Sequence, residues 1–487
     1  MGDEIFELAT RLGMWVVPGI SCCDAWQHWK HWSSHTLDVA TRSIASQVLR
    51  TRGHASALAF WYSSDELPPP VVEKRYLAVF AEFLWPNALL ASASNLTSTL
   101  THENTGVKVS FPSLVVILGV SQFFLFQMSG PYRWVPPVFW YQSTVDSILQ
   151  GGAFGFLSEG GPGQAPMTYE SLTSALVDLW PLDNADWMYH NANPAGLFGR
   201  HDYFSSHLAA RYGTASNAKE YSHWAQVASY ESYRAFFESY NVNQASLVSW
   251  MLQAGRPQNQ WHLIEYNGMA GGAYFGVKLA NEPVHALLEP DANGTFSVVS
   301  VMSLGQLTNI QLTVRVYDLS GNNTFSHYVS FSGPRIVRDV ARIPASAASR
   351  NARFVELVVS VNASAVSRNV YWLPAIGSED VFDWSSDQYN LLQSANLTAF
   401  VQLPRQAVNT KDVVIDGAHS SITISNPGPG VVFFLRLRLV DQNEQDVVPS
   451  LWSNNFLTLF TGQEVSVVVD SSLASSKPAK FLLDPLR

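Results

Sequence analysis

Two acidic residues stand at the ends of apolar, strand-like runs, each directly after a serine. The first run, residues 57–65, ends in Asp65, and the second, residues 152–159, ends in Glu159. A carboxylate at the tip of a buried strand costs free energy unless it is paired or used. In one parallel barrel, both acids would lie at the same mouth. One could then protonate a leaving oxygen while the other attacks a sugar carbon, which is the chemistry of retaining glycoside cleavage.

Each acid also has a structural alternative. Asp65 could cap the helix that we expect after Pro70, because aspartate is a common N-cap residue. Glu159 could form a salt bridge in a loop. The catalytic interpretation therefore depends on both acids being brought together by the strands that carry them.

Residues 1–288 alternate helices with short apolar strands, a pattern that predicts a parallel sheet. A long helix is expected over residues 219–240. The six expected strands are 14–17, the run ending at Asp65, 89–92, 138–141, the run ending at Glu159, and 247–252. A closed (β/α)8 barrel has eight strands, so we predict a partial TIM barrel that lacks its first two.

The remainder of the chain changes to a period of two. Ile310, Leu312 and Val314 alternate with polar residues, and Gly/Asn-rich turns separate such runs. This pattern predicts antiparallel β-sandwiches of immunoglobulin type. The fold class is therefore multidomain, α/β plus all-β, with a catalytic barrel at 1–288 followed by sandwiches at 289–377 and 378–487.

Composition excludes some partners. The net charge of −10 argues against nucleic acid, whose binding proteins carry basic stripes. The two cysteines, Cys22 and Cys23, are adjacent, so the chain has neither a disulfide framework nor metal-ligand spacing. We expect no metal and no cofactor.

Targeting signals are weak. The first residues lack a signal-peptide pattern, whereas five glycosylation sequons favour secretion slightly. Residues 109–127 are apolar and uncharged and barely reach the length of a membrane span, but Pro112 and Gly119 interrupt them. The sequons lie at Asn95, Asn293, Asn322, Asn362 and Asn396.

Several longer motifs resemble glycoside hydrolase family 2, in the branch of the exo-β-D-glucosaminidases. Together they span nearly the whole chain. They are PGISCCDAW (18–26), SSD (63–65), SGPYRWVPPVFWY (129–141), GGAFGFLSE (151–159), ANEPVH (280–285) and SRNVYWL (367–373).

The resemblance implies roles for both acids. Most of the family has Asn-Glu at the acid/base strand, but this branch has Ser-Asp, which matches Ser64 and Asp65. Glu159 matches the nucleophile. The dipeptide Asn281–Glu282 copies the common acid/base pair, but it follows a helix-like segment, so we interpret it as the exit from the last barrel helix.

The implied activity is removal of β-D-glucosamine from the non-reducing end of chitosan oligosaccharides. The partner is then an oligosaccharide, not nucleic acid or a membrane, and the full-length protein is expected to be an extracellular monomer. The candidate substrate-binding residues are Ser64, Ser21, Asp24, Trp26, Tyr132, Trp134, Tyr141 and Tyr189. For Trp134 and Tyr189, a core role is an open alternative.

The resemblance also implies missing and extra parts. Two sandwiches and two barrel strands would lie upstream of Met1. Residues 109–127 would be extra, and they begin with Val and end with Gln, whose codons can begin GT and end AG. We therefore hypothesise a retained intron translated in frame and a misassigned start.

Two departures concern the sugar and the site. The resemblance implies glutamate before the cysteine pair, near the substrate amine, where this chain has Ser21, and threonine after the nucleophile, where it has Gly160. A β-mannosidase or a β-galactosidase-like hydrolase is therefore an alternative. A second alternative is an inactive fragment, because a barrel without two strands exposes open edges.

Overall fold

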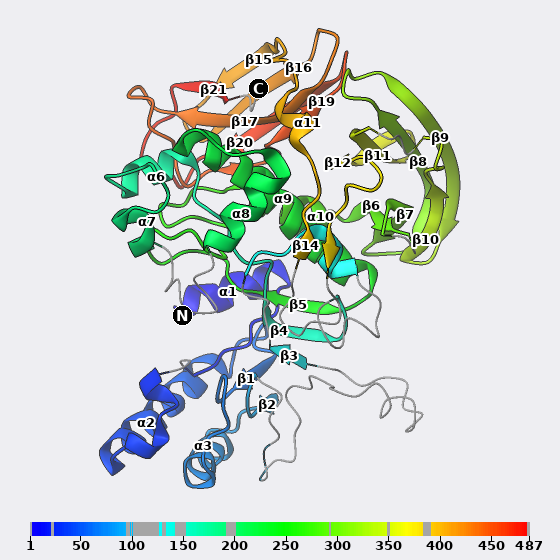
Figure 1. Ribbon diagram of the computed structural model, residues 1–487. Coiled ribbons are helices and arrows are strands. Elements are labelled where there is room, and N and C mark those ends of the chain that lie inside the picture. Colours follow the sequence, from blue (N-terminus) through cyan, green and yellow to red (C-terminus); the bar gives the residue numbers. More distant parts are fainter. Residues whose placement is uncertain are drawn as a thin grey trace. The chain divides into compact units, whose positions relative to one another are not determined.

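The chain divides into two compact units in a computed structural model (Figure 1). Unit 1 comprises Met1–Ser129, Phe154–Gly160 and Ser246–Val248, and unit 2 comprises Gly130–Ala153, Gly161–Ala245 and Ser249–Arg487. The structure describes residues 2–20, 24–93, 98, 100, 126–128, 133–141, 152–190, 201–291, 294–347, 351–382 and 391–484.

Local sequence signals account for the helices of unit 1. Helix α1 (Asp3–Leu12) ends at Gly13, whose φ of 68° is accessible to glycine without strain. The side chain of Ser33 caps α2 (Ser34–Thr51) by accepting a hydrogen bond from the Thr36 amide at 3.1 Å. Helix α3 (Pro70–Glu82) begins with proline, whose missing N–H would have no helical partner there.

Short parallel strands connect these helices. Strand β1 (Ala59–Trp61) pairs in parallel with β2 (Ala88–Leu90), and β3 (Phe126–Met128) pairs in parallel with β4 (Phe156–Gly160). Strand β5 (Ser246–Ser249) completes a sheet of order β3-β4-β5. Parallel bridges join Val16 to Ala57 and Gly19 to Trp61, so the predicted strand near residue 14 also runs beside β1. Over the described residues these strands form two small open sheets.

One predicted strand is wrong. Residues 138–141 lie in a 3₁₀ helix, η3 (Pro137–Tyr141). A proline fixes the backbone at the start of this helix, and the aromatic side chains that follow pack to the sides of the helix. The ring centroids of Trp140 and Phe236 are 4.4 Å apart. Conversely, Phe126 and Gln127, the last two residues of the hypothesised insertion, belong to β3. The rest of that segment lies outside the described residues.

The main helix of unit 2 agrees with the prediction. The expected long helix is α9 (Ala218–Val242), capped by the Asn217 side chain, which accepts from the Glu220 amide at 2.9 Å. Helix α10 (Gly272–Ala280) ends at Asn281, which confirms that this residue and Glu282 mark a helix exit. The shorter helices are α6 (Tyr169–Ala175), α7 (Ala185–His190), α8 (His201–Tyr212) and α11 (Thr398–Val401).

The first sandwich of unit 2 contains two antiparallel sheets, of order β10-β7-β6 and β12-β11-β8-β9. Ile310, Leu312 and Val314 of β8 face a core shared by both sheets, as their period of two predicts. The first strand begins at Val284, so the predicted boundary at 288 falls inside it. The strands are β6 (Val284–Pro290), β7 (Phe296–Ser303), β8 (Leu307–Tyr317), β9 (Asn323–Gly333), β10 (Ile336–Arg342), β11 (Arg353–Val361) and β12 (Ser364–Leu373).

A second pair of antiparallel sheets follows, of order β15-β16-β20-β18 and β19-β17-β21. The hairpin β13 (Val381–Phe382) and β14 (Leu391–Gln393) precedes it, close to the predicted boundary at 377. The strands are β15 (Asn409–Ile415), β16 (His419–Ser425), β17 (Val432–Val440), β18 (Leu451–Trp452), β19 (Leu457–Leu459), β20 (Glu464–Asp470) and β21 (Lys480–Asp484). Within the described ranges, no helix is long and apolar enough to cross a membrane.

A buried charge joins α9 to the first sandwich. Glu238 accepts hydrogen bonds from His285 Nε2 at 2.8 Å, from the Tyr371 hydroxyl at 2.8 Å and from Asn369 Nδ2 at 2.9 Å. Burial alone would raise the pKa of Glu238, but the bond from His285 and the charge of Arg234 hold that pKa below its usual value. Glu238 is therefore ionised and paired, which makes it a structural anchor.

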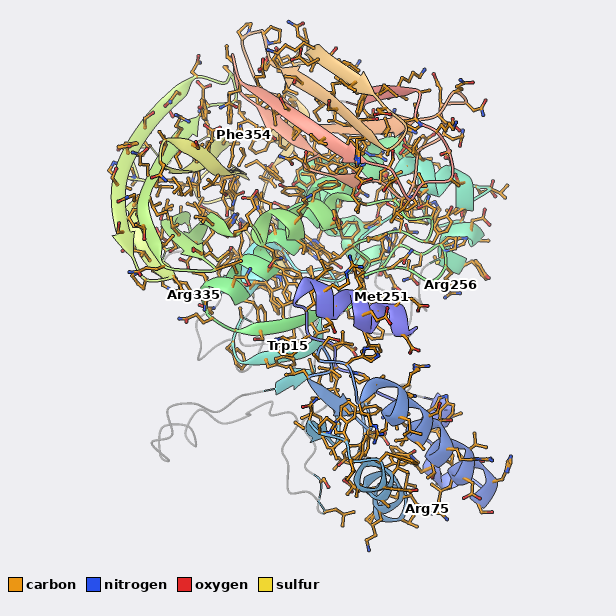
Figure 2. The ribbon with its side chains drawn as sticks, turned by 180° about the vertical axis from the view of Figure 1, so that it is seen from behind. Trp15, Arg75, Met251, Arg256, Arg335 and Phe354 are labelled. Carbon is orange, nitrogen blue, oxygen red and sulfur yellow. The ribbon has the colours of Figure 1, made fainter. Side chains whose placement is uncertain are left out.

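Aromatic side chains join the two sandwiches. Phe354 of β11, labelled in Figure 2, is completely buried, and its ring lies 5.0 Å from that of Phe400 and 5.5 Å from that of Phe433. Phe433 belongs to β17 of the second sandwich. The two sandwiches therefore share one apolar cluster, which includes Phe354, Val370 and Trp372 and is distinct from the cluster between the two sheets of the first sandwich.

Phe354→Ala is expected to lower the free energy of unfolding of unit 2 by about 3–5 kcal/mol, because it opens a cavity in this shared core. Thermal unfolding followed by circular dichroism measures the change. Tyr328→Ala, which truncates a ring 58% exposed on β9, is the matched control and should change stability by less than about 0.5 kcal/mol. Equal midpoints for the two variants would contradict the shared core.

Candidate active site

Asp65 follows the carboxyl end of β1. Backbone hydrogen bonds between this part of the chain and the β2 segment, which is β2 with the residues that follow it, continue beyond the ends of both strands. The Tyr62 amide donates to the Leu90 carbonyl at 3.0 Å, and the Ala93 amide donates to the Ser64 carbonyl at 2.9 Å. The Ser64 hydroxyl donates to Asp65 Oδ1 at 2.8 Å. Asp65 is half-buried. Helix α3 has Pro69 as its N-cap, without a side-chain bond, so Asp65 does not cap it.

Glu159 lies within β4 and is also half-buried. The preceding residue, Ser158, is 5% exposed, and its hydroxyl donates to the Ala93 carbonyl at 2.8 Å. Ala93 therefore binds Ser64 through its amide and Ser158 through its carbonyl. The residues that precede the two acids thus converge on one residue of the β2 segment.

A ring contact also joins the strands that carry the acids. The rings of Trp61 in β1 and Phe156 in β4 have centroids 6.5 Å apart. Asp65 follows Trp61 by four residues and Glu159 follows Phe156 by three, so each acid comes shortly after this contact along its own segment.

A loop with two predicted substrate contacts lies beside the end of β1. Asp24 and Trp26 belong to η1 (Asp24–Trp26), and Gln27 Nε2 donates to the Ser63 hydroxyl at 3.3 Å. Trp26 is 39% exposed and meets Trp32 edge-on. Gln27 could not be identified from the sequence, because a single glutamine has no distinctive chemistry. Ser21 and Tyr132 lie outside the described residues.

The other three candidates belong to unit 2. Trp134 is 1% exposed, donates from Nε1 to the Ser232 hydroxyl at 3.0 Å and stacks on His207. This placement replaces the predicted sugar contact with a packing role, because no open ring face remains. The Tyr141 hydroxyl donates to Glu238 Oε2 at 2.9 Å, and burial beside that carboxylate raises the pKa of Tyr141. Tyr189, in α7, is 70% exposed.

A strongly perturbed carboxyl group elsewhere in unit 2 has a structural explanation. Burial raises the pKa of Glu265 to about 7, a value that would suit an acid or base in catalysis. Its oxygens, however, accept from the Thr168 amide at 2.7 Å and the Thr168 hydroxyl at 3.1 Å, at the start of α6. Within the part of the chain that the structure describes, no group of three His, Cys, Asp or Glu could hold a metal ion.

Gly160, directly after Glu159, is tightly enclosed. A β-carbon at this position would lie 2.6 Å from Cδ2 of Leu157, a side chain that is itself 1% exposed. The threonine that the resemblance implies would therefore require Leu157 to move.

Comparison with known proteins supports the resemblance drawn from the motifs. A family model described as the exo-beta-D-glucosaminidase Ig-fold domain matches residues 388–481. An exo-beta-D-glucosaminidase from Streptomyces avermitilis is 30% identical over 96% of this chain and 52% of its own length. One from Arthroderma benhamiae is 27% identical over 96% of this chain and 53% of its own.

The fold is similar to that of the Amycolatopsis orientalis exo-chitosanase CsxA, with a TM-score of 0.82 and 25% identity over 100% of this chain and 59% of that one. A β-D-mannosidase from Dictyoglomus thermophilum shares the fold, with a TM-score of 0.68 and 13% identity. The chain spans about half the length of the curated relatives it matches.

Glu265→Gln is expected to flatten the pH dependence of stability. Because the folded pKa is raised from 4.5 to about 7, the carboxyl contributes fully below pH 4.5 and its contribution is lost as pH rises through 7. The loss amounts to about 3 kcal/mol at most. Glutamine keeps the acceptor for Thr168 without a charge. Unfolding midpoints between pH 4.5 and 8 measure the slope, and the exposed Glu464→Gln should leave it as in the wild type.

Proposed function

We propose that this chain, a homologue of the exo-β-D-glucosaminidases over 96% of its length, carries the catalytic part of a retaining exo-β-glycosidase. The proposed reaction is removal of β-D-glucosamine from the non-reducing end of chitosan oligosaccharides. The observation that carries the proposal is the convergence of Ser64 and Ser158, the neighbours of the two acids, on Ala93. Parallel strand ends are where catalysis occurs in (β/α)8 barrels, and we assign the parallel strands to such a barrel.

In the first step, Asp65 transfers its proton to the glycosidic oxygen while a carboxylate oxygen of Glu159 attacks the anomeric carbon. The C1–O bond to the leaving sugar breaks, and an ester forms between Glu159 and the glycosyl group. A separation of roughly 5–5.5 Å between the two carboxyl groups suits this attack, because no water then fits between nucleophile and sugar.

In the second step, Asp65, now ionised, takes a proton from water, whose oxygen attacks the same carbon. The ester bond breaks and Glu159 leaves as a carboxylate. Two inversions at C1 give net retention. The hydroxyl of Ser64 donates to Asp65 Oδ1, which supports the view that the carboxyl group is held in one orientation through both steps.

The identity of the sugar is a separate part of the proposal. Solved complexes of the Amycolatopsis protein, in which an aspartate or a glutamate is replaced by alanine, contain PNP-β-D-glucosamine. The resemblance implies an acid near the substrate amine at the position that Ser21 occupies here. A β-mannoside or β-galactoside is the alternative substrate. The five sequons support the proposal that the enzyme is extracellular, and we expect it to be a monomer.

Asp65→Asn is expected to lower kcat on β-glucosaminides by about 10²–10⁴-fold, the usual contribution of a general acid–base group. Glu159→Gln should abolish turnover because the ester cannot form. Glu282→Gln, at the helix exit that imitates the acid/base dipeptide, is the control and should leave turnover unchanged. Purified residues 1–487 are assayed by release of glucosamine, with NMR of the first-formed anomer to detect retention.

Each rival has its own outcome in this assay. If the wild-type chain folds but hydrolyses no glycoside, the result supports the alternative that the chain is an inactive fragment. Faster turnover of aryl mannoside or galactoside than of glucosaminide would replace glucosamine as the proposed sugar and leave the proposed mechanism unchanged. Full activity in Asp65→Asn would reject the assignment of the acid.

A further inference from the structure

Two buried serines form hydrogen bonds at the strand ends that carry the acids. Ser92 is completely buried, and its hydroxyl donates to the Ser64 carbonyl at 2.6 Å. Ser158 is 5% exposed and donates to the Ala93 carbonyl at 2.8 Å. Each hydroxyl is thus bound to the backbone of the neighbouring segment.

These bonds lie where the regular pairing of the strands has ended. Strands β1 and β2 are only three residues long, and Ser64 is three residues beyond Trp61. Its carbonyl accepts both the Ala93 amide, at 2.9 Å, and the Ser92 hydroxyl. Buried carbonyls require such partners. The backbone next to Asp65 is therefore held by a side chain as well as by the main chain.

The bonds connect into a single path. Asp65 is bound by the Ser64 hydroxyl, the Ser64 carbonyl is bound by Ser92 and Ala93, and the Ala93 carbonyl is bound by Ser158, which precedes Glu159. Because hydrogen bonds tolerate only small changes in length, this path limits how far the two acids can shift relative to each other.

Packing alone could also explain a buried serine, and unit 1 contains a case for comparison. Ser56 is 2% exposed and donates to the Phe6 carbonyl at 3.0 Å. It stands before β1, at the end of the strand opposite to Asp65. The same side chain, burial and type of bond therefore also occur away from the acids.

We propose that Ser92 and Ser158 are positioning residues, Ser92 holding Asp65 through the Ser64 carbonyl and Ser158 holding Glu159 through the Ala93 carbonyl. The inference rests on the proposed roles of the two acids. Neither serine takes part in the chemistry itself. A displacement of about 1 Å at a reacting group can reduce a rate about a hundredfold, so the loss of either bond should be visible in kinetics.

The dependence of kcat/KM on the leaving group distinguishes the proposed roles of the two serines. Cleavage of the glucosamine dimer requires a proton on its leaving oxygen, whereas 2,4-dinitrophenol leaves without one. Ser92→Ala should therefore lower kcat/KM for the dimer about 10–100-fold and that for the dinitrophenyl glucosaminide less than about threefold. Ser158→Ala, which displaces the nucleophile, should lower both by similar factors. Ser56→Ala should change neither.

Amide hydrogen exchange tests the same inference without catalysis. Ser92→Ala should increase exchange in peptides covering residues 61–67, and Ser158→Ala in peptides covering 154–160, while Ser56→Ala leaves both unchanged. Equal unfolding midpoints for Ser92→Ala and Ser56→Ala exclude general destabilisation as the cause.

The outcomes distinguish this inference from the proposed function. If the wild type is active and Asp65→Asn is not, but Ser92→Ala matches Ser56→Ala in kinetics and exchange, the positioning role is rejected and the proposed function stands. If no glycoside is hydrolysed, the proposed function fails, and unchanged exchange in Ser92→Ala and Ser158→Ala rejects the positioning of the strand ends as well.

Discussion

The candidate site depends on how backbone carbonyls are satisfied where short parallel strands end. Regular pairing over β1 and β2 covers only three residues on each strand, so the groups beyond it need other donors. Serine is well suited to this position, because its hydroxyl is small enough to be buried and can donate to a neighbouring carbonyl. This requirement gives a physical reason for Ser92 and Ser158, whose hydroxyls donate to the Ser64 and Ala93 carbonyls. The Ser64 hydroxyl instead donates to the aspartate itself.

Unit 2 is stabilised by a different principle, in which buried charges are neutralised by several partners at once. Glu238 is bound by His285, Asn369 and Tyr371, so α9 and the first sandwich share one hydrogen-bond network. Removing a single partner from such a network leaves an uncompensated charge, which costs more than the bond itself contributes. The network fixes how the helix lies against the strands, and it also explains why Tyr141 is engaged there through its hydroxyl.

Sequence patterns predicted the elements with a strong period and missed contacts between distant residues. The long helix α9 and the antiparallel strands followed from their periodicity, and both acids were selected as candidates from their position after apolar runs. The strand predicted for the aromatic run at 138–141 was wrong, because the sequence of a short apolar segment does not distinguish a strand from a 3₁₀ turn. Strand β3 was not predicted because residues 109–127 were attributed to an insertion. Gln27 and Ser92 escaped notice because their partners, Ser63 and Ser64, lie 36 and 28 residues away.

The absence of a side chain at residue 160 limits which substitutions this part of β4 accepts. A β-carbon there would lie 2.6 Å from Cδ2 of the buried Leu157, so a larger residue at 160 requires the Leu157 side chain to shift. Redesign next to Glu159 therefore has to treat positions 157 and 160 as a pair, with a smaller side chain at 157 introduced in the same exchange as any β-carbon at 160.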